Sequence, residues 1–178
     1  MSEFDIKTLS ISPKICEMLS EILIEVVTNG ESVSFMYPLQ PETAYAFWMD
    51  SLAAAAQGKR MVLGAWDGEI LAGTVTLLLD CPPNQPHRAE IAKLMTRISH
   101  RRRGIAAALM RAAEDLAVKQ DRTLLMLDTA VDGGASGLYE GLGFTLAGTI
   151  PDYALKPYGG LTGTHIYWKR IGNHPAPR

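Results

Sequence analysis

Hydrophobic and polar positions follow two different periods along the chain, and together they predict a mixture of helices and strands. Apolar residues that recur every three or four positions indicate amphipathic helices, while short apolar or alternating runs indicate strands. The expected helices are residues 12–30, 41–58, 105–119 and 134–144. The expected strands are residues 4–9, 59–66, 69–79, 89–97, 123–130, 144–150 and 164–170.

Residues at the ends of these segments support the prediction. Ser12 is placed as a helix N-cap with Pro13 in the first turn, and Asn29–Gly30 is a typical helix stop. Asp67–Gly68 lies between two strand patterns, as in a tight β-hairpin. The buried stripe of the third helix is expected to be Ile105, Leu109, Ala112 and Leu116. The order of elements predicts an α/β (α+β) fold, in which helices flank a mixed, mostly antiparallel central sheet.

Composition is that of an ordinary globular protein. The 178 residues are 47% hydrophobic and 20% charged, with a net charge of -2, so we expect one domain over residues 1–178 and no general attraction to nucleic acid or membranes. We expect a cytoplasmic protein, because no apolar run reaches the about 20 residues that span a bilayer and "MSEFDIKTLS" does not resemble a signal peptide. Cys16 and Cys81 have no disulfide-framework or metal-site spacing, so no metal is expected, and residues 172–178 are expected to fray.

Positive charge is concentrated in "RRRGIA", residues 101–106, where an expected helix begins. A helix N-terminus carries unpaired N–H groups and a partial positive charge, so it binds phosphate readily. Gly104 lets the backbone approach an anion, and Ala106 keeps the next position small. A phosphate site and a solvated or nucleic-acid-binding basic turn are both open on spacing alone. The chain lacks G-K-[ST] at this point, which argues against a P-loop NTPase.

A second motif and its spacing narrow the interpretation. "RRRGIA" follows the expected strand "IAKLMTR", and "DGGASGLYEGLGF" follows further along the chain. These segments resemble the R/Q-x-x-G-x-G/A and N-x-x-A-x-x-L-Y-x-x-x-G-F motifs of the GNAT superfamily of N-acetyltransferases, with Asp132 at the usual Asn position. The resemblance covers residues from about Lys59 to Trp168 and implies central strands that splay apart, acetyl-CoA as cosubstrate and an amine acceptor.

Further stretches resemble the tabtoxin-resistance-like acetyltransferases within that superfamily. They are "NGESVSFM", "HRAEIAKLM", "LLMLDT", "LYEGLGF" and "THIYWK", and they extend the similarity over nearly the whole chain. This resemblance implies a small-molecule acceptor that is amino-acid-like or toxin- or antibiotic-like. Direct transfer in a ternary complex is expected because no well-placed nucleophile argues for an acetyl-enzyme. A non-catalytic acyl-CoA sensor and a protein N-acetyltransferase are the alternatives. A homodimer is common among similar proteins.

The resemblance also implies where the cosubstrate lies. The diphosphate of coenzyme A is expected at Arg101, Arg102, Arg103, Gly104, Ile105 and Ala106. The pantetheine arm is expected along Leu94, Met95 and Thr96, where a backbone N–H would polarise the thioester carbonyl. His100 is expected to be solvated or to lie on the phosphate side.

Three side chains are candidates for the chemistry, because an acceptor alkylammonium, with a pKa of about 10, must lose a proton before it attacks. Glu90 matches a proposed catalytic glutamate of the tabtoxin-resistance-like proteins and is the first candidate base; the alternative is a solvent-facing strand residue. Asp128 is expected to bind the ammonium or share the base role, with a cap or turn residue as the alternative. Tyr139 matches the family tyrosine near the sulfur and is expected to protonate the leaving thiolate; the alternative is a core aromatic.

The acceptor is expected to lie among side chains from distant parts of the chain. Ser34 and Phe35 are expected to line its pocket together with Glu90 and Asp128, and the alternative is a capped helix exit around a buried Phe35. Residues 151–164 are expected to be a mobile loop that closes the other wall.

Overall fold

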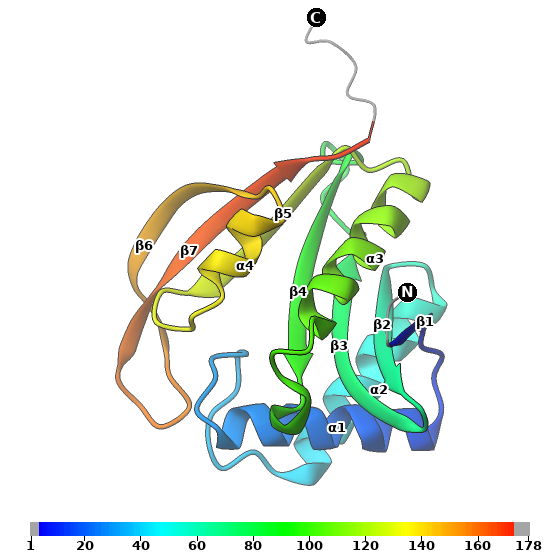
Figure 1. The fold of residues 1–178 in the computed structure, drawn as a ribbon, viewed down its shortest axis with the longest axis vertical. Coiled ribbons are helices and arrows are strands. Elements are labelled where there is room, and N and C mark those ends of the chain that lie inside the picture. The colour runs from blue at the N-terminus through cyan, green and yellow to red at the C-terminus, as the bar shows by residue number, and fades with distance from the viewer. Residues whose placement is uncertain (1–3, 173–178) are drawn as a thin grey trace, which may run out of the picture.

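The computed structural model describes residues 4–172, in which seven strands form one sheet (Figure 1). The strands are β1 (Asp5–Thr8), β2 (Arg60–Asp67), β3 (Ile70–Leu78), β4 (Arg88–Thr96), β5 (Leu124–Ala130), β6 (Thr145–Leu155) and β7 (Leu161–Arg170). Their order across the sheet is β1-β2-β3-β4-β5-β7-β6, and only the pair β4–β5 is parallel among these strands. The predicted mixed, mostly antiparallel sheet is confirmed. Residues 173–178 of the tail that was expected to fray lie outside the described part of the chain.

Helices cover both faces of the sheet (Figure 1). They are α1 (Pro13–Thr28), α2 (Pro41–Ala56), α3 (Ile105–Lys119) and α4 (Ser136–Gly141), with a short 3-10 helix at Ile98–His100. One apolar cluster packs α1 and α2 on one face around Leu19 and Trp48, and a second packs α3 and α4 on the other face around Leu109 and Tyr139. Burying both faces is what stabilises a sheet of this kind.

Local sequence signals place the helix ends. The Ser12 side chain accepts a hydrogen bond from the backbone N–H of Ile15 at 3.2 Å, and Gly30 follows the helix with φ of +87°. Both ends of α1 therefore lie where the sequence predicts them. In α3 the buried stripe is rotated by about one position from the prediction: it consists of Ile105, Leu109, Met110, Ala113 and Ala117, with Ala112 and Leu116 partly buried at its edge.

The strands β4 and β5 pair over a short distance and then diverge. Their pairing covers Arg88–Glu90 against Leu124–Met126. Beyond these residues the ribbons separate towards the end that carries the arginine loop (Figure 1). A bulge in β4 accompanies the divergence, because Thr74 of β3 pairs with Met95 while Thr76 pairs with Ala92. The predicted splayed central strands are thus present.

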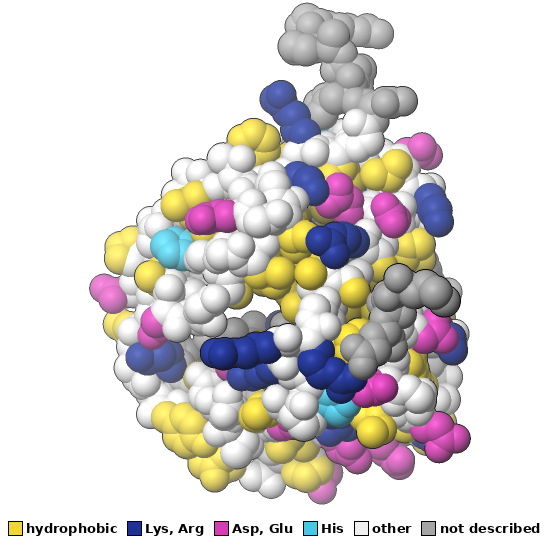
Figure 2. All heavy atoms as spheres, in the orientation of Figure 1, with side chains coloured by type: hydrophobic (Ala, Val, Ile, Leu, Met, Phe, Trp, Pro, Cys, Tyr) yellow, Lys and Arg dark blue, Asp and Glu magenta, His cyan; other side chains and the backbone are white. Residues whose placement is uncertain are grey.

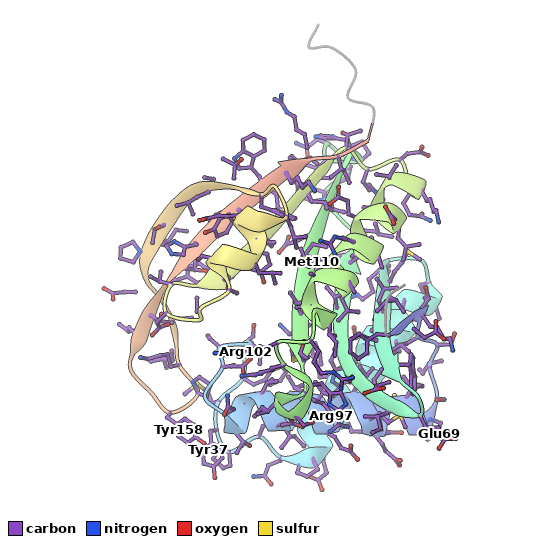
Figure 3. The ribbon with its side chains drawn as sticks, viewed as in Figure 1. Tyr37, Glu69, Arg97, Arg102, Met110 and Tyr158 are labelled. Atoms are coloured by element: carbon purple, nitrogen blue, oxygen red, sulfur yellow. The ribbon has the colours of Figure 1, made fainter. Side chains whose placement is uncertain are left out.

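Residues 151–164, expected to be a mobile loop that closes the other wall of the site, instead complete a long hairpin, so the loop part of that prediction is wrong. Residues of this hairpin, among them Tyr153 and Thr162, do line a cavity beside β5, as the wall part predicts. Pro151 lies within β6, which is an edge strand and tolerates the missing N–H. The hairpin turn contacts the loop after α1, because the Tyr158 hydroxyl donates to the carbonyl of Thr28 at 2.6 Å and the Tyr37 and Tyr158 rings stack at 4.5 Å. Figure 3 shows these two tyrosines side by side.

Candidate active site

Two adjoining hollows lie where β4 and β5 diverge. The larger, of about 900 Å³, is lined in part by Arg101, Arg102, Gly104, Ile105, Ala106 and Lys156. The smaller, of about 190 Å³, is lined in part by Ser34, Ala92, Lys93, Asp128 and Thr164. Leu94, Thr129 and Tyr139 line both, so the two spaces meet at these residues. Figure 2 shows an opening on this face of the molecule with Lys and Arg side chains gathered beside it.

The three arginines of the loop point in different directions. Arg102, whose backbone has φ of +60°, lines the larger hollow and extends from the loop at its rim (Figure 3). Arg101 also lines the hollow and is ion-paired with Glu31. Arg103 donates to Asp67 at 3.0 Å and lies over the Phe4 ring at 4.8 Å, so it anchors the loop instead of lining the hollow. A phosphate contact of Arg103 stays a prediction.

His100, expected to be solvated or on the phosphate side, lines the larger hollow with the arginine loop, in agreement with the second of these alternatives. Its side chain is buried, with Nε2 3.4 Å from Asp67 and Nδ1 2.8 Å from the Ser99 hydroxyl. Arg97, which directly precedes the 3-10 helix, is ion-paired with Glu25 at 3.2 Å. The loop is therefore held by buried and half-buried polar contacts at its base, while Arg102 remains at the rim.

The start of α3 has the chemistry of a phosphate site. Gly104 is its N-cap with φ of +82°, a conformation that a residue with a Cβ adopts only with strain. Nothing lies within 4 Å of the position that a Cβ would take on Gly104, so the backbone faces open space. Ile105 and Ala106 bring the first N–H groups of the helix to the larger hollow. Free donors and nearby guanidinium groups fit a diphosphate.

A further cation at the larger hollow was not anticipated from the sequence. Lys156, in the hairpin turn, lines the hollow and lies 3.2 Å from Asp132. Asp132 also accepts from the Thr162 hydroxyl at 2.8 Å, and the hydrogen bonds from Thr162 and Lys156 lower the pKa of its carboxyl. The residue at the motif's usual Asn position therefore fixes the hairpin turn next to the hollow. No local pattern predicts this, because the two segments meet only in the folded chain.

The bulge of β4 shapes the edge that separates the two hollows. Leu94 and Thr96 line the larger hollow, whereas Met95 is buried against α1 and α2. Lys93, at the bulge, has φ of +52° and lines the smaller hollow. Backbone that departs from regular pairing has groups available for a ligand. The pantetheine position and the polarising N–H remain predictions.

Tyr139 lies at the junction of the two hollows. Its side chain is 6% exposed, and it packs against Phe144 and Tyr167 with ring centroids 6.1 and 5.8 Å away. Burial raises the pKa of its hydroxyl to about 12, although a hydrogen bond with Thr129 opposes the shift. The tyrosine is therefore both a core aromatic and a lining residue, and at neutral pH it is a hydrogen-bond donor.

The structure brings Asp128 and Tyr139 together but leaves Glu90 outside both hollows. Asp128 lines the smaller hollow and accepts from the Thr164 hydroxyl at 3.3 Å. Glu90 lies on β4 where the strands still pair, and its carboxylate is 3.3 Å from the guanidinium of Arg88. Alternation along the paired strands places the two carboxylates on the same face of the sheet. The base role of Glu90 stays a prediction.

The loop after α1 contributes one of the two expected lining residues to the smaller hollow. Ser34 lines it, with φ of +74°. Phe35 packs edge-on against Phe47 at 5.2 Å, in agreement with the alternative of an aromatic packed at the helix exit. Lys93, which the sequence did not single out, donates to the Ser34 hydroxyl at 3.2 Å. From the sequence, a lysine between apolar strand residues is expected to face solvent. In the folded chain Lys93 lies at the bulge of β4 and lines the smaller hollow.

The comparison with family models decides the class of protein. The model described as the acetyltransferase (GNAT) family matches residues 24–144, which is more than half of the chain. The chain belongs to the GNAT acetyltransferase family. The predicted enzyme class, an acetyltransferase with acetyl-CoA as cosubstrate, is confirmed at the level of this family. The match includes the arginine loop, Asp128 and Tyr139, whereas Lys156 and Thr164, which also line the hollows, lie beyond it.

Solved structures with little sequence identity have the same fold. YncA from Salmonella typhimurium, assigned as an acetyltransferase and solved with its cofactor acetyl-CoA, is 16% identical, with a TM-score of 0.75 over 97% of this chain and 98% of that one. A ribosomal-protein-alanine N-acetyltransferase from Brucella melitensis is 18% identical, with a TM-score of 0.78 over 94% and 99%. A protein assigned as a phosphinothricin N-acetyltransferase is 17% identical, with a TM-score of 0.75 over 95% and 100%. Because these sequence identities are low, the three comparisons show a shared fold and no more.

Within residues 4–172, no three His, Cys, Asp or Glu side chains come together as a metal site would require. None of the helices in the described part of the chain is both long and apolar enough to span a bilayer.

Proposed function

We propose that this GNAT enzyme transfers the acetyl group of acetyl-CoA directly to the amine of a small molecule. The observation that carries the proposal is the junction of the two hollows at Tyr139, because it brings a cationic space and a space beside Asp128 together. Arg101, Arg102 and the first N–H groups of α3 would hold the diphosphate in the larger space. The amine would enter the smaller space, which has the size of a small acceptor.

The chain's own groups meet the chemical demands of the transfer. Asp128 would hold the acceptor ammonium and accept its proton, or Glu90 would accept it through a water. As the C–N bond forms and the C–S bond breaks, a backbone N–H near Leu94 or Met95 would stabilise the carbonyl oxygen. Tyr139 would donate a hydrogen bond to the departing sulfur. Neither cysteine lines the two hollows, which favours transfer without an acetyl-enzyme.

The comparisons favour one class of acceptor. Similarity to the tabtoxin-resistance-like proteins and the fold of a phosphinothricin N-acetyltransferase favour an amino-acid-like or toxin- or antibiotic-like amine, with a role in resistance. The fold of a ribosomal-protein N-acetyltransferase keeps a protein acceptor as the second candidate. The volume of the smaller hollow, about 190 Å³, favours the small molecule. A cytoplasmic location, a homodimer and the absence of nucleic-acid and membrane partners remain predictions.

The test combines acetyl-CoA binding with turnover. We expect saturable binding of acetyl-CoA that falls at least tenfold in the double variant Arg102→Glu, Gly104→Val. Arg103→Gln is the matched control, because Arg103 is in the same loop but contacts Asp67 and Phe4, and we expect a smaller loss. Thiol release with a panel of primary amines then separates enzyme from sensor. Unchanged binding in the double variant would place the diphosphate elsewhere, and binding without any turnover would favour the sensor.

A further inference from the structure

Lys93 and Ser34 form an unusual contact at the wall of the smaller hollow. They lie 59 residues apart in the sequence, and the Lys93 ammonium donates to the Ser34 hydroxyl at 3.2 Å. Both residues have left-handed backbone conformations, with φ of +52° and +74°. Residues with a Cβ adopt this conformation at a cost, and such strain concentrates at functional sites. Two strained positions therefore meet on one side of the space proposed for the acceptor.

The charge of Lys93 has no carboxylate in contact with it. Among residues 4–172 its contacts are with the Ser34 hydroxyl and with the Phe47 ring, whose centroid is 5.7 Å from Nζ. Burial lowers the pKa of the lysine, and the more distant charge of Asp128 partly opposes the shift. Half-buried ammonium groups are normally paired. This one faces a hollow, so an anion entering that hollow would complete its surroundings.

Asp128 supplies the opposite charge within the same hollow. It accepts a hydrogen bond from Thr164 and lines the space together with Lys93, yet the two charged groups form no ion pair within 4.0 Å. Two unlike charges that face one small space without touching are complementary to a molecule that carries both charges itself. The Ser34 hydroxyl accepts from Lys93 and retains its own proton for an incoming oxygen atom.

We infer that Lys93 and Ser34 bind an acid group of the acceptor while Asp128 holds its amine, so the acceptor is a small zwitterion that carries both. This inference rests on the proposed function and adds the chemical class of the acceptor and a residue that selects it. A carboxylate would accept from the Lys93 ammonium and the Ser34 hydroxyl, and both hydrogen bonds would be charge-assisted because the acceptor is ionised. The acid group takes no part in bond formation and orients the amine.

The experiment compares pairs of acceptors that are identical except that one carries a carboxylate and the other a carboxamide. Free amino acids are each paired with the corresponding α-carboxamide, and kcat and KM are measured from thiol release with acetyl-CoA. We expect the wild type to favour the acid by at least tenfold in kcat/KM, mostly through KM. In Lys93→Met, which keeps a long apolar stem, the ratio of acid to amide should fall to about one. Lys93→Arg keeps the cation and should restore part of the preference.

A binding measurement separates failure of this inference from failure of the proposed function. Calorimetric titration of the same pairs, with coenzyme A present, reports acceptor binding without turnover. Acid-selective binding that disappears in Lys93→Met would support the inference even if no amine were acetylated, in which case the proposed function would fail alone. Equal binding of acid and amide to the wild type, or no binding of any panel member, would overturn the inference. A Lys93→Met variant that slows both acceptors equally and keeps their ratio would also overturn it, because that is the result expected of a base or a structural residue.

Discussion

The raised pKa of Tyr139 leads to a quantitative prediction about its part in catalysis. A phenol with a pKa of about 12 is a much weaker acid than a thiol, whose pKa is about 8.5. Complete transfer of its proton to the departing thiolate is therefore uphill by about 5 kcal/mol, at 1.36 kcal/mol for each pKa unit. We therefore expect Tyr139 to act by donating a hydrogen bond, with the sulfur taking its proton from water after it departs.

The hydrogen-bond role sets the size of the effect for Tyr139→Phe. Hydrogen bonds to charged groups contribute about 1.5–3 kcal/mol, so kcat should fall by roughly 10- to 150-fold. The phenylalanine ring keeps the contacts with Phe144 and Tyr167, so the fold should be retained. The assay is kcat for thiol release at saturating acetyl-CoA and an accepted amine, from pH 6 to 10.

The pH dependence and a matched control make the test specific. Because its pKa is raised, Tyr139 stays protonated throughout this pH range, so the ratio of wild-type to variant kcat should be constant. Tyr167→Phe deletes another buried hydroxyl, one that donates to Glu140 at 3.1 Å and lines neither hollow, and it should change kcat little. Full turnover of Tyr139→Phe at every pH would refute the donor role. A loss well above 1000-fold, within the range of strong general-acid catalysis, would refute the hydrogen-bond argument.

Two further predictions concern stability. Hydrogen bonds from Thr162 and Lys156 lower the pKa of Asp132, so its contribution is present above the unfolded pKa of about 3.9 and is lost as the pH falls through the folded value. The melting temperature of Asp132→Asn should therefore lie below that of the wild type at pH 7, and the difference should close as the pH falls through the lowered pKa of Asp132; a constant difference would contradict this. Leu109 is fully buried, so Leu109→Ala should lower the free energy of unfolding by about 2–5 kcal/mol in urea denaturation. Val118→Ala, at an exposed position of the same helix, is the control, and equal losses for both would contradict the burial argument.

Predictions that depended on neighbouring residues agree well with the structure. Ser12 and Asn29–Gly30 bound α1 as expected, because caps are decided by a few adjacent residues. The hairpin turn lies at Gly68–Glu69, one residue later than the predicted Asp67–Gly68, since Asp67 still pairs with Ile70. The loop that feeds α3 likewise has its glycine at the N-cap. The resemblance to GNAT enzymes added the splayed strands, which no local pattern contains. The error over residues 151–164 arose because proline and glycine normally interrupt strands, whereas β6 is an edge strand and tolerates them.

The sequence by itself determined the elements, their order and the cationic start of α3, because helix and strand periods and end signals act over short distances. Only the tertiary structure decided which side chains share the site. It turned Arg103 towards Asp67, left Glu90 beside Arg88 and brought Lys93 to Ser34. These outcomes depend on a bulge, on the divergence of two strands and on contacts between distant segments. Such features follow from the packing of the whole sheet, so they cannot be predicted from any single stretch of the chain.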